Sequence, residues 1–147
     1  MLVTNHVLAG ALVGYAAPGP VSAFVGGVAS HFGMDVVPHW GDRPIETVMH
    51  IAVADGLTGL AAMAWVWRSA PRRKRWRVLA GMVGGAMPDL DKPSTVFFGF
   101  SPFPAAWDEF HSVIQTEDSR RMPQEIVVGA ALGLAVLTWS RVSRPHA

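Results

Sequence analysis

The sequence contains no cysteine, which excludes both a disulfide scaffold and a thiolate metal site. Charge is also scarce, because only 16% of the 147 residues are charged, against about 25% in an average soluble domain. No stretch alternates polar and apolar residues for long enough to predict a β-strand, and no internal repeat stands out. The chain is therefore predicted to be one all-α domain over residues 1–147, in which any metal ion is held by histidine and carboxylate ligands.

Proline, glycine and capping residues divide the chain into about five main helices and one short helix. The main helices are predicted over residues 4–17, 20–37, 46–67, 76–87 and 123–140, and the short one over residues 105–115. Residues 92–104 are rich in proline and phenylalanine and are predicted to form an irregular apolar loop. We expect no cleaved signal peptide, because no lysine or arginine precedes the apolar run at residues 7–17.

The apolar composition raises the question of a membrane. The helix predicted over residues 46–67 is long enough to cross a hydrocarbon layer of about 30 Å. Three pairs of glycines four residues apart, of the kind that lets helices approach closely in lipid, are Gly10/Gly14, Gly81/Gly85 and Gly129/Gly133. A soluble bundle with a glycine and alanine core is the alternative. We expect a bundle that is membrane-embedded or membrane-associated.

Half of the twelve basic residues lie in a single cluster between residues 68 and 77. Such clusters mark the cytoplasmic ends of membrane-spanning helices, and Arg141 and Arg144 place the end of the last helix on the same side. The orientation of the helices in a membrane is enough to explain these basic residues, so we expect no nucleic-acid partner. Counting back along the chain, the second helix ends and the third begins on the extracytoplasmic side.

The stretch Ser30 to His39 is the most informative one. His31 and Asp35 are four residues apart, so they share one helix face. Pro38 disfavours helix at the residue before it and leaves His39 in the exit loop. Imidazole and carboxylate groups so arranged suit zinc or a similar divalent ion. The alternative is a hydrogen-bonded structural pair.

Two further carboxylates, Asp89 and Asp91, follow the fourth predicted helix. They would face its negative dipole end, which is unfavourable unless a cation is bound nearby. The alternative is an Asx-type turn that only stops the helix.

The remaining histidines and acids of interest fall at the same end of the predicted bundle. His111 lies on the short helix, and Glu125 complements the dipole at the start of the last helix. His50 and Asp55 diverge on their helix, so only one of them is expected to be a ligand; His146 lies in the polar tail and is set aside. The predicted metal ligands are His6, His31, Asp35, Asp55, Asp89 and His111, with Asp91 and His39 as catalytic residues. These groups exceed the needs of one zinc ion, so two or three ions, or one ion with a general base, stay open.

These motifs carry a resemblance to known proteins. The segments at residues 4–10, 30–39, 88–93 and 110–112 resemble those of small bacterial inner-membrane proteins described as metal-dependent hydrolase-like. In those proteins a histidine usually follows the second aspartate of the Pro-Asp-x-Asp element, where this chain has Lys92. His31, Asp35 and His39 are more distantly similar to the pattern of zinc-dependent phospholipase C, an all-helical enzyme that hydrolyses phosphoesters.

The resemblance implies a metal-dependent hydrolase of the bacterial inner membrane. We expect zinc as cofactor, a phosphoester as substrate, membrane lipid as partner, and a site on the extracytoplasmic side. The second hypothesis is a non-catalytic membrane subunit or scaffold, in which the His/Asp cluster is structural. A homo-oligomer or a larger membrane complex is compatible with either.

Overall fold

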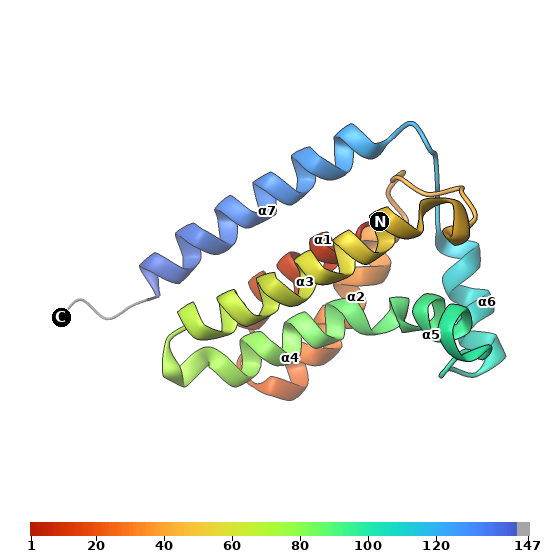
Figure 1. The fold of residues 1–147 in the computed structure, drawn as a ribbon. Coiled ribbons are helices and arrows are strands. Elements are labelled where there is room, and N and C mark those ends of the chain that lie inside the picture. The colour runs from red at the N-terminus through yellow and green to blue at the C-terminus, as the bar shows by residue number, and fades with distance from the viewer. Residues whose placement is uncertain (144–147) are drawn as a thin grey trace.

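The computed structural model describes residues 1–143, so Arg144 and His146 lie outside the described residues. Within this range the fold is all-helical (Figure 1). The α-helices are α1 (Val3–Ala16), α2 (Pro20–Asp35), α3 (Met49–Ser69), α4 (Arg75–Ala86), α5 (Asp91–Phe98), α6 (Ala105–Ile114) and α7 (Met122–Val142). Short 3-10 helices, η1 (Ile45–Val48), η2 (Arg72–Lys74) and η3 (Met87–Leu90), precede α3, α4 and α5. The predicted main helices are confirmed, with ends shifted by a few residues.

The predicted loop over residues 92–104 is wrong in its first half, where α5 forms. Pro88 does not stop the chain's helical course, because the 3-10 turn η3 leads from α4 directly into α5. Pro93 falls in the first turn of α5, where a missing N–H costs no helical hydrogen bond. Gly99 ends the helix in the left-handed conformation, with φ of 78°, which glycine adopts without steric cost.

The core is made by α1, α2 and α4, which contact one another along their lengths. Glycines allow this close approach. A Cβ atom on Gly10 would collide with the backbone of Gly81, and one on Gly84 would collide with the backbone of Phe24. The buried side chains around this contact include Tyr15 and Met82. The ends of these three helices are therefore fixed against one another by backbone contact.

The glycine pairs thus have different surroundings. Gly10/Gly14 and Gly81/Gly85 face neighbouring backbone, as predicted. Gly129 faces only the side chain of Asn5, and a Cβ atom on Gly133 would meet no atom within 4 Å. Among the described residues of the chain, no helix therefore approaches Gly133 closely.

Within residues 1–143, two helices are long and apolar enough to cross a membrane, namely the segment Ile45–Ser69, which contains α3, and α7. Only 6% and 17% of their apolar windows are buried inside the protein. A core helix of a soluble protein would be mostly buried, so these two helices differ from that pattern. Membrane insertion is weakly suggested on this basis.

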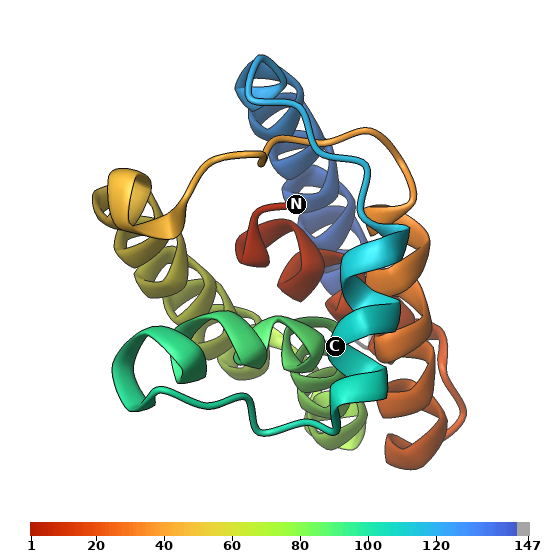
Figure 2. The same cartoon turned by 90° about the vertical axis from the view of Figure 1, so that its right-hand side faces the viewer.

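Polar and basic groups are sorted to opposite ends of the bundle, as the sequence predicted. The first residues of α1, the last residues of α2, the segment η3 and the helix α6 gather at one end (Figures 1 and 2). The basic turn between α3 and α4 lies at the far end, as does the last turn of α7 with Arg141 (Figure 1). Four chain segments far apart in the sequence thus meet at the end that carries the histidines.

Candidate metal centre

Three side chains form the centre of the polar end. His31 Nε2, His111 Nε2 and Asp35 Oδ2 each lie 3.1 Å from the other two atoms. His31 and Asp35 come from the last turns of α2, and His111 comes from α6. All three side chains are at most 1% exposed. The i, i+4 spacing predicts that His31 and Asp35 share a helix face. The fold brings His111 to them, although it lies 76 residues after Asp35 in the sequence.

Outer contacts orient both imidazole rings. His31 Nδ1 donates a hydrogen bond of 2.8 Å to the carbonyl oxygen of Gly85, which leaves the lone pair on Nε2. His111 Nδ1 lies 3.6 Å from Asp91 Oδ2, so the carboxylate favours a proton on Nδ1. The Nε2 atoms of both rings then face Asp35 Oδ2, while their second nitrogens lie beside acceptors, as in metal-ligating histidines.

Asp89, from η3, completes a group that can hold a metal ion. His31, Asp35, Asp89 and His111 each offer one ligand atom, and these atoms all lie within 4.8 Å of one another. We call these four residues the ligand group. Asp89 Oδ1 lies 4.0 Å from His111 Nε2. It also accepts a 2.9 Å ion-paired hydrogen bond from Lys92 Nζ.

Electrostatic interactions shift the ionisation of the groups around Asp89. Burial raises the pKa of Asp89, but the neighbouring charges, Lys92 first, outweigh it and hold this pKa well below its usual range. Burial lowers the pKa of Lys92. The neighbouring carboxylate of Asp89 has the larger effect in the opposite direction, so the pKa of Lys92 is raised above its ordinary value. Burial likewise lowers the pKa of His111, while the hydrogen bonds to Asp35 and Asp91 raise it to about 9. In the absence of a metal ion, a proton on His111 and the charge of Lys92 balance the carboxylates.

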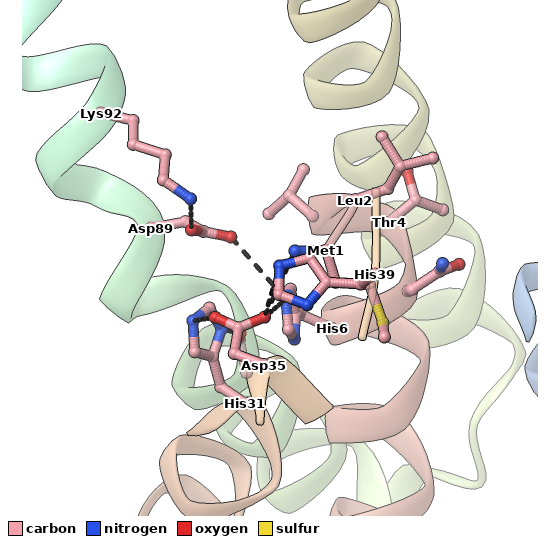
Figure 3. A network of polar contacts seen from close by, with 12 residues as sticks. Met1, Leu2, Thr4, His6, His31, Asp35, His39, Asp89 and Lys92 are labelled. Carbon is pink, nitrogen blue, oxygen red and sulfur yellow. Dashed lines mark hydrogen bonds and ion pairs between the residues drawn. The ribbon is translucent and has the colours of Figure 1, made fainter. Parts of the chain in front are cut away.

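His6, from the first turn of α1, lies beside the ligand group (Figure 3). Its ring stacks on His31 with centroids 3.9 Å apart. Its Nε2 lies 3.2 Å from Asp35 Oδ1 and 3.9 Å from Asp89 Oδ2. The side chain is fully buried, and within residues 1–143 its Nδ1 has no hydrogen-bond partner, while its Nε2 faces the two carboxylates.

His39 reaches the same carboxylate from the loop after α2. Its backbone N–H donates to Thr116 O at 2.9 Å, and Asp118 N–H donates to its carbonyl at 2.8 Å. These bonds hold the loop against the link between α6 and α7. Its Nδ1 donates to Val37 O at 2.8 Å, so its Nε2 carries the lone pair and lies 3.9 Å from Asp35 Oδ1. Burial lowers the pKa of His39 below its ordinary value, so the ring is neutral at neutral pH.

Two predicted site residues have other contacts. Asp55, predicted as a metal ligand, accepts hydrogen bonds from the backbone N–H groups of Val3 at 2.6 Å and Thr4 at 3.2 Å. It therefore caps α1, whose first N–H groups have no partner within the helix. Asp91, predicted as catalytic, contacts the far nitrogen of His111 and the backbone N–H of Lys92. Its predicted catalytic role stays a prediction.

Two residues at this end were missed by the sequence analysis. Gln115 Nε2 lies 3.3 Å from Asp35 Oδ2 and 3.0 Å from His111 Nε2. The signal for Gln115 was its i, i+4 spacing from His111 on α6. Glu125 was predicted only to complement the helix dipole. It also accepts hydrogen bonds from Leu2 N, Asn5 Nδ2 and Trp40 N at 2.8–3.1 Å, which no local pattern indicates.

Comparison with family models, with curated proteins and with solved structures gave no match. The family resemblance of the motifs therefore stays a prediction, and the function has to be inferred from the ligand group itself. Four buried side chains that can hold a metal ion are the finding from which that inference starts.

Proposed function

We propose that this chain is a membrane-embedded, metal-dependent hydrolase that cleaves a phosphoester, with zinc as the metal that its donors suit best. The observation that carries the proposal is the triangle of His31 Nε2, His111 Nε2 and Asp35 Oδ2, with sides of 3.1 Å. In the metal-free chain, the proton on His111, whose pKa is about 9, and the amide nitrogen of Gln115 relieve the contact among these groups. Once that proton is lost, two imidazole lone pairs and a carboxylate oxygen converge on one buried point, where a divalent ion would take the place of the proton.

The dimensions of the triangle fit a small tetrahedral ion. Ligand atoms about 2.0–2.1 Å from a tetrahedral zinc ion lie about 3.4 Å from one another. The observed 3.1 Å separations need only a small adjustment to reach this value. Asp89 is the nearest further carboxylate, and the carbonyl of Gly85 and the carboxylate of Asp91 supply the outer contacts that such sites use.

A bound zinc ion supplies a water of lowered pKa and polarises a phosphoryl oxygen. His39 is the proposed proton acceptor, because its Nδ1 donates to Val37 O and its Nε2, with the free lone pair, lies 3.9 Å from Asp35 Oδ1. In hydrolysis a water oxygen would form the new bond to phosphorus as the ester P–O bond breaks. His39 Nε2 would take the water proton, and the departing alkoxide would take up a proton from the surrounding solvent. Lys92, held at Asp89, is positioned to pair with a negatively charged phosphoryl oxygen.

Exposed aromatic side chains support a lipid as the substrate. Phe97, Phe98 and Phe100 are 62–72% exposed, and Phe110 is 50% exposed. They belong to α5, to the turn after it and to α6, which cross the end of the bundle beside the ligand group (Figure 2). If α3 and α7 span a bilayer, these side chains lie at its surface, where an apolar surface of this kind can enter the interface.

The basic turn at the far end supports placement of the site outside the cytoplasm of a bacterial cell. The natural absence of cysteine allows a direct test with single substitutions. In intact cells an impermeant maleimide should label Ser119→Cys, in the link between α6 and α7, and should leave Arg73→Cys unlabelled until the cells are lysed. The reverse pattern, or equal labelling of both, would contradict the placement.

The second candidate function is a non-catalytic membrane subunit whose polar cluster is structural. The 2.9 Å pair of Lys92 and Asp89 favours it, because the lysine already provides a positive charge beside a ligand carboxylate. On this account the full chain would bind no divalent ion tightly and would be stabilised by Lys92.

A hydrolysis assay separates these two functions. The full chain, purified in detergent, is given a chromogenic phosphodiester and, separately, vesicles of phosphatidylglycerol and phosphatidylethanolamine. We expect hydrolysis that a chelator abolishes and zinc restores. His31→Ala should not be restored by zinc, whereas the exposed His50→Ala control should behave as the unmodified protein. Hydrolysis that survives both chelation and His31→Ala would refute the proposal, as would its absence with every divalent ion tried.

A further inference from the structure

The end of the bundle opposite the ligand group carries positive charge that no carboxylate of the chain balances. The sequence has no aspartate or glutamate over residues 56–88 or after residue 125. Seven basic residues lie in the turn between α3 and α4 and in the last turn of α7 (Figure 1). Within residues 1–143, none of them forms an ion pair. We call this set the basic end; its members are Arg68, Arg72, Arg73, Lys74, Arg75, Arg77 and Arg141.

Two members of the basic end hold the turn in place. Arg75 donates from Nε to the carbonyl oxygen of Ala70 at 3.2 Å, which closes the end of α3. Lys74 Nζ donates to Tyr15 O at 3.4 Å and lies 3.3 Å from Ser143 Oγ. Lys74 therefore joins η2 to the ends of α1 and α7, and the other cations are carried by a backbone that is fixed at the junction of these helices.

The remaining positive groups around Lys74 lack acceptors. Arg73 is exposed and has no hydrogen bond within the described residues. The Nε atom of Arg77 is buried and has no hydrogen-bond partner there either, which is costly for an N–H group. Burial lowers the pKa of Lys74, and the nearby charges of Arg77 and Arg73 lower it further. Three cations thus repel one another at the start of α4, where the positive end of the helix dipole adds to their charge.

Tryptophan side chains show in which environment this end lies. Trp76, in the first turn of α4, is 67% exposed, and Trp65 and Trp139, near the ends of α3 and α7, are 46% and 45% exposed. Exposed tryptophans gather where a bilayer meets water, with the ring at the level of the lipid headgroups. If α3 and α7 span a bilayer, the basic end therefore lies at the depth of the headgroup phosphates. This placement favours a lipid over a nucleic acid as the source of the anion.

We propose that Arg73, Lys74 and Arg77 bind the headgroup phosphate of an anionic phospholipid such as phosphatidylglycerol, on the membrane face opposite the ligand group. A guanidinium group can donate to two phosphate oxygens at once, and an ammonium group adds a third contact. Orientation in the membrane needs only positive charge near a helix end, so it does not depend on which residues carry the charge. The inference uses the proposed membrane placement and does not depend on hydrolysis.

The test measures the lipid preference of the full chain in phosphatidylcholine vesicles. A chelator is present throughout, so that the proposed hydrolysis cannot consume the lipid. Spin-labelled phosphatidylglycerol and spin-labelled phosphatidylcholine are compared by electron paramagnetic resonance, which reports the fraction of each lipid that the protein immobilises. We expect the relative affinity for phosphatidylglycerol to be about fivefold higher.

Single-charge variants distinguish the proposed site from general attraction. Arg73→Gln and Arg77→Gln should each remove most of the preference for phosphatidylglycerol. Arg68→Gln removes the same charge elsewhere in the basic end, and Arg120→Gln removes it at the opposite end of the bundle. Both of these control variants should keep the preference of the unmodified protein.

Equal affinity of the unmodified chain for the two lipids would overturn the inference, whatever the variants do. An equal loss of preference in Arg68→Gln and Arg73→Gln would also overturn it, because the attraction would then be spread over the whole basic end. In a second arm, the chain in detergent is offered a labelled single-stranded oligonucleotide; binding that dioctanoyl phosphatidylglycerol does not displace would identify a nucleic-acid surface instead. Failure of the chain to enter vesicles would overturn the membrane placement as well, whereas absence of hydrolysis would leave this inference standing.

Discussion

Two sets of helices have similar compositions but different surroundings. The inner set is α1, α2 and α4, and the outer set is α3 and α7. Both sets are rich in glycine, alanine and aliphatic residues. The inner helices meet backbone to backbone at Gly10, Gly81 and Gly84 and carry His6, His31 and Asp35 at their ends. The outer helices leave most of their apolar side chains uncovered. The inner set therefore positions the ligand group, and the outer set exposes an apolar surface, which we propose is covered by a bilayer.

The largest expected difference is between a methyl group added to an inner helix and a methyl group added to an outer helix. Gly81→Ala puts a Cβ atom into the backbone of Gly10, and we expect it to lower the free energy of unfolding by at least about 2 kcal/mol. Gly133→Ala, on the outer helix α7, meets open space and should be neutral or stabilising by up to about 1 kcal/mol. Denaturant titration of the two variants in detergent measures both. Equal losses of stability would show that the outer helix is packed as tightly as the inner ones.

Glu125 joins the outer helix α7 to the start of α1, so it tests how firmly the two sets are connected. Glu125→Ala leaves the donors on Leu2, Asn5 and Trp40 without this acceptor. We expect a loss of about 2 kcal/mol in the free energy of unfolding. Glu125→Gln retains one acceptor oxygen and should lose less than half of that. The same denaturant titrations record both, and a larger loss for the glutamine variant would count against these hydrogen bonds.

Lys92 tests whether the polar end of the inner set is built for a metal ion or for an ion pair. Lys92→Met removes the cation that competes for Asp89 at 2.9 Å. On the metal-site account, zinc affinity measured with a competing chelator should rise by about tenfold, since a like charge is removed from the vicinity of the ion. Unchanged affinity together with marked destabilisation would favour the structural subunit.

Asp55 lies on the outer helix α3 and is expected to give the smallest effect. Asp55→Asn weakens the hydrogen bonds that the carboxylate accepts from the backbone N–H groups of Val3 and Thr4 at the start of α1. We expect the free energy of unfolding to fall by about 1 kcal/mol. The metal content per chain should stay that of the unmodified protein. A variant that folds normally and loses metal would instead restore Asp55 as a ligand.

Much of the fold follows from local sequence signals, and the exceptions have a physical cause. Prolines at helix starts and the Pro18-Gly19-Pro20 break predict the positions of α1, α2 and α7 well. The helix α5 escapes prediction because Pro93 resembles a helix breaker, although proline in a first turn costs nothing. The local sequence does not reveal that the turn before Pro93 is helical.

The site was predicted in part for a related reason. His31 and Asp35 could be paired by helical spacing alone, and the sorting of charges along the helices placed Asp89 and His111 at the same end. The stacking of His6 on His31 depends on how closely α1 and α2 approach each other, which no local pattern indicates. Asp55 lies outside the ligand group and caps α1. The sequence could not reveal this, because a carboxylate that caps another helix has the same local pattern as a ligand.

Anomalous diffraction from crystals of the full chain grown with zinc tests the central claim most directly. The account predicts an anomalous peak among His31 Nε2, His111 Nε2 and Asp35 Oδ2, about 2 Å from each. A map with no peak there, or with zinc only at exposed histidines such as His50, would contradict it.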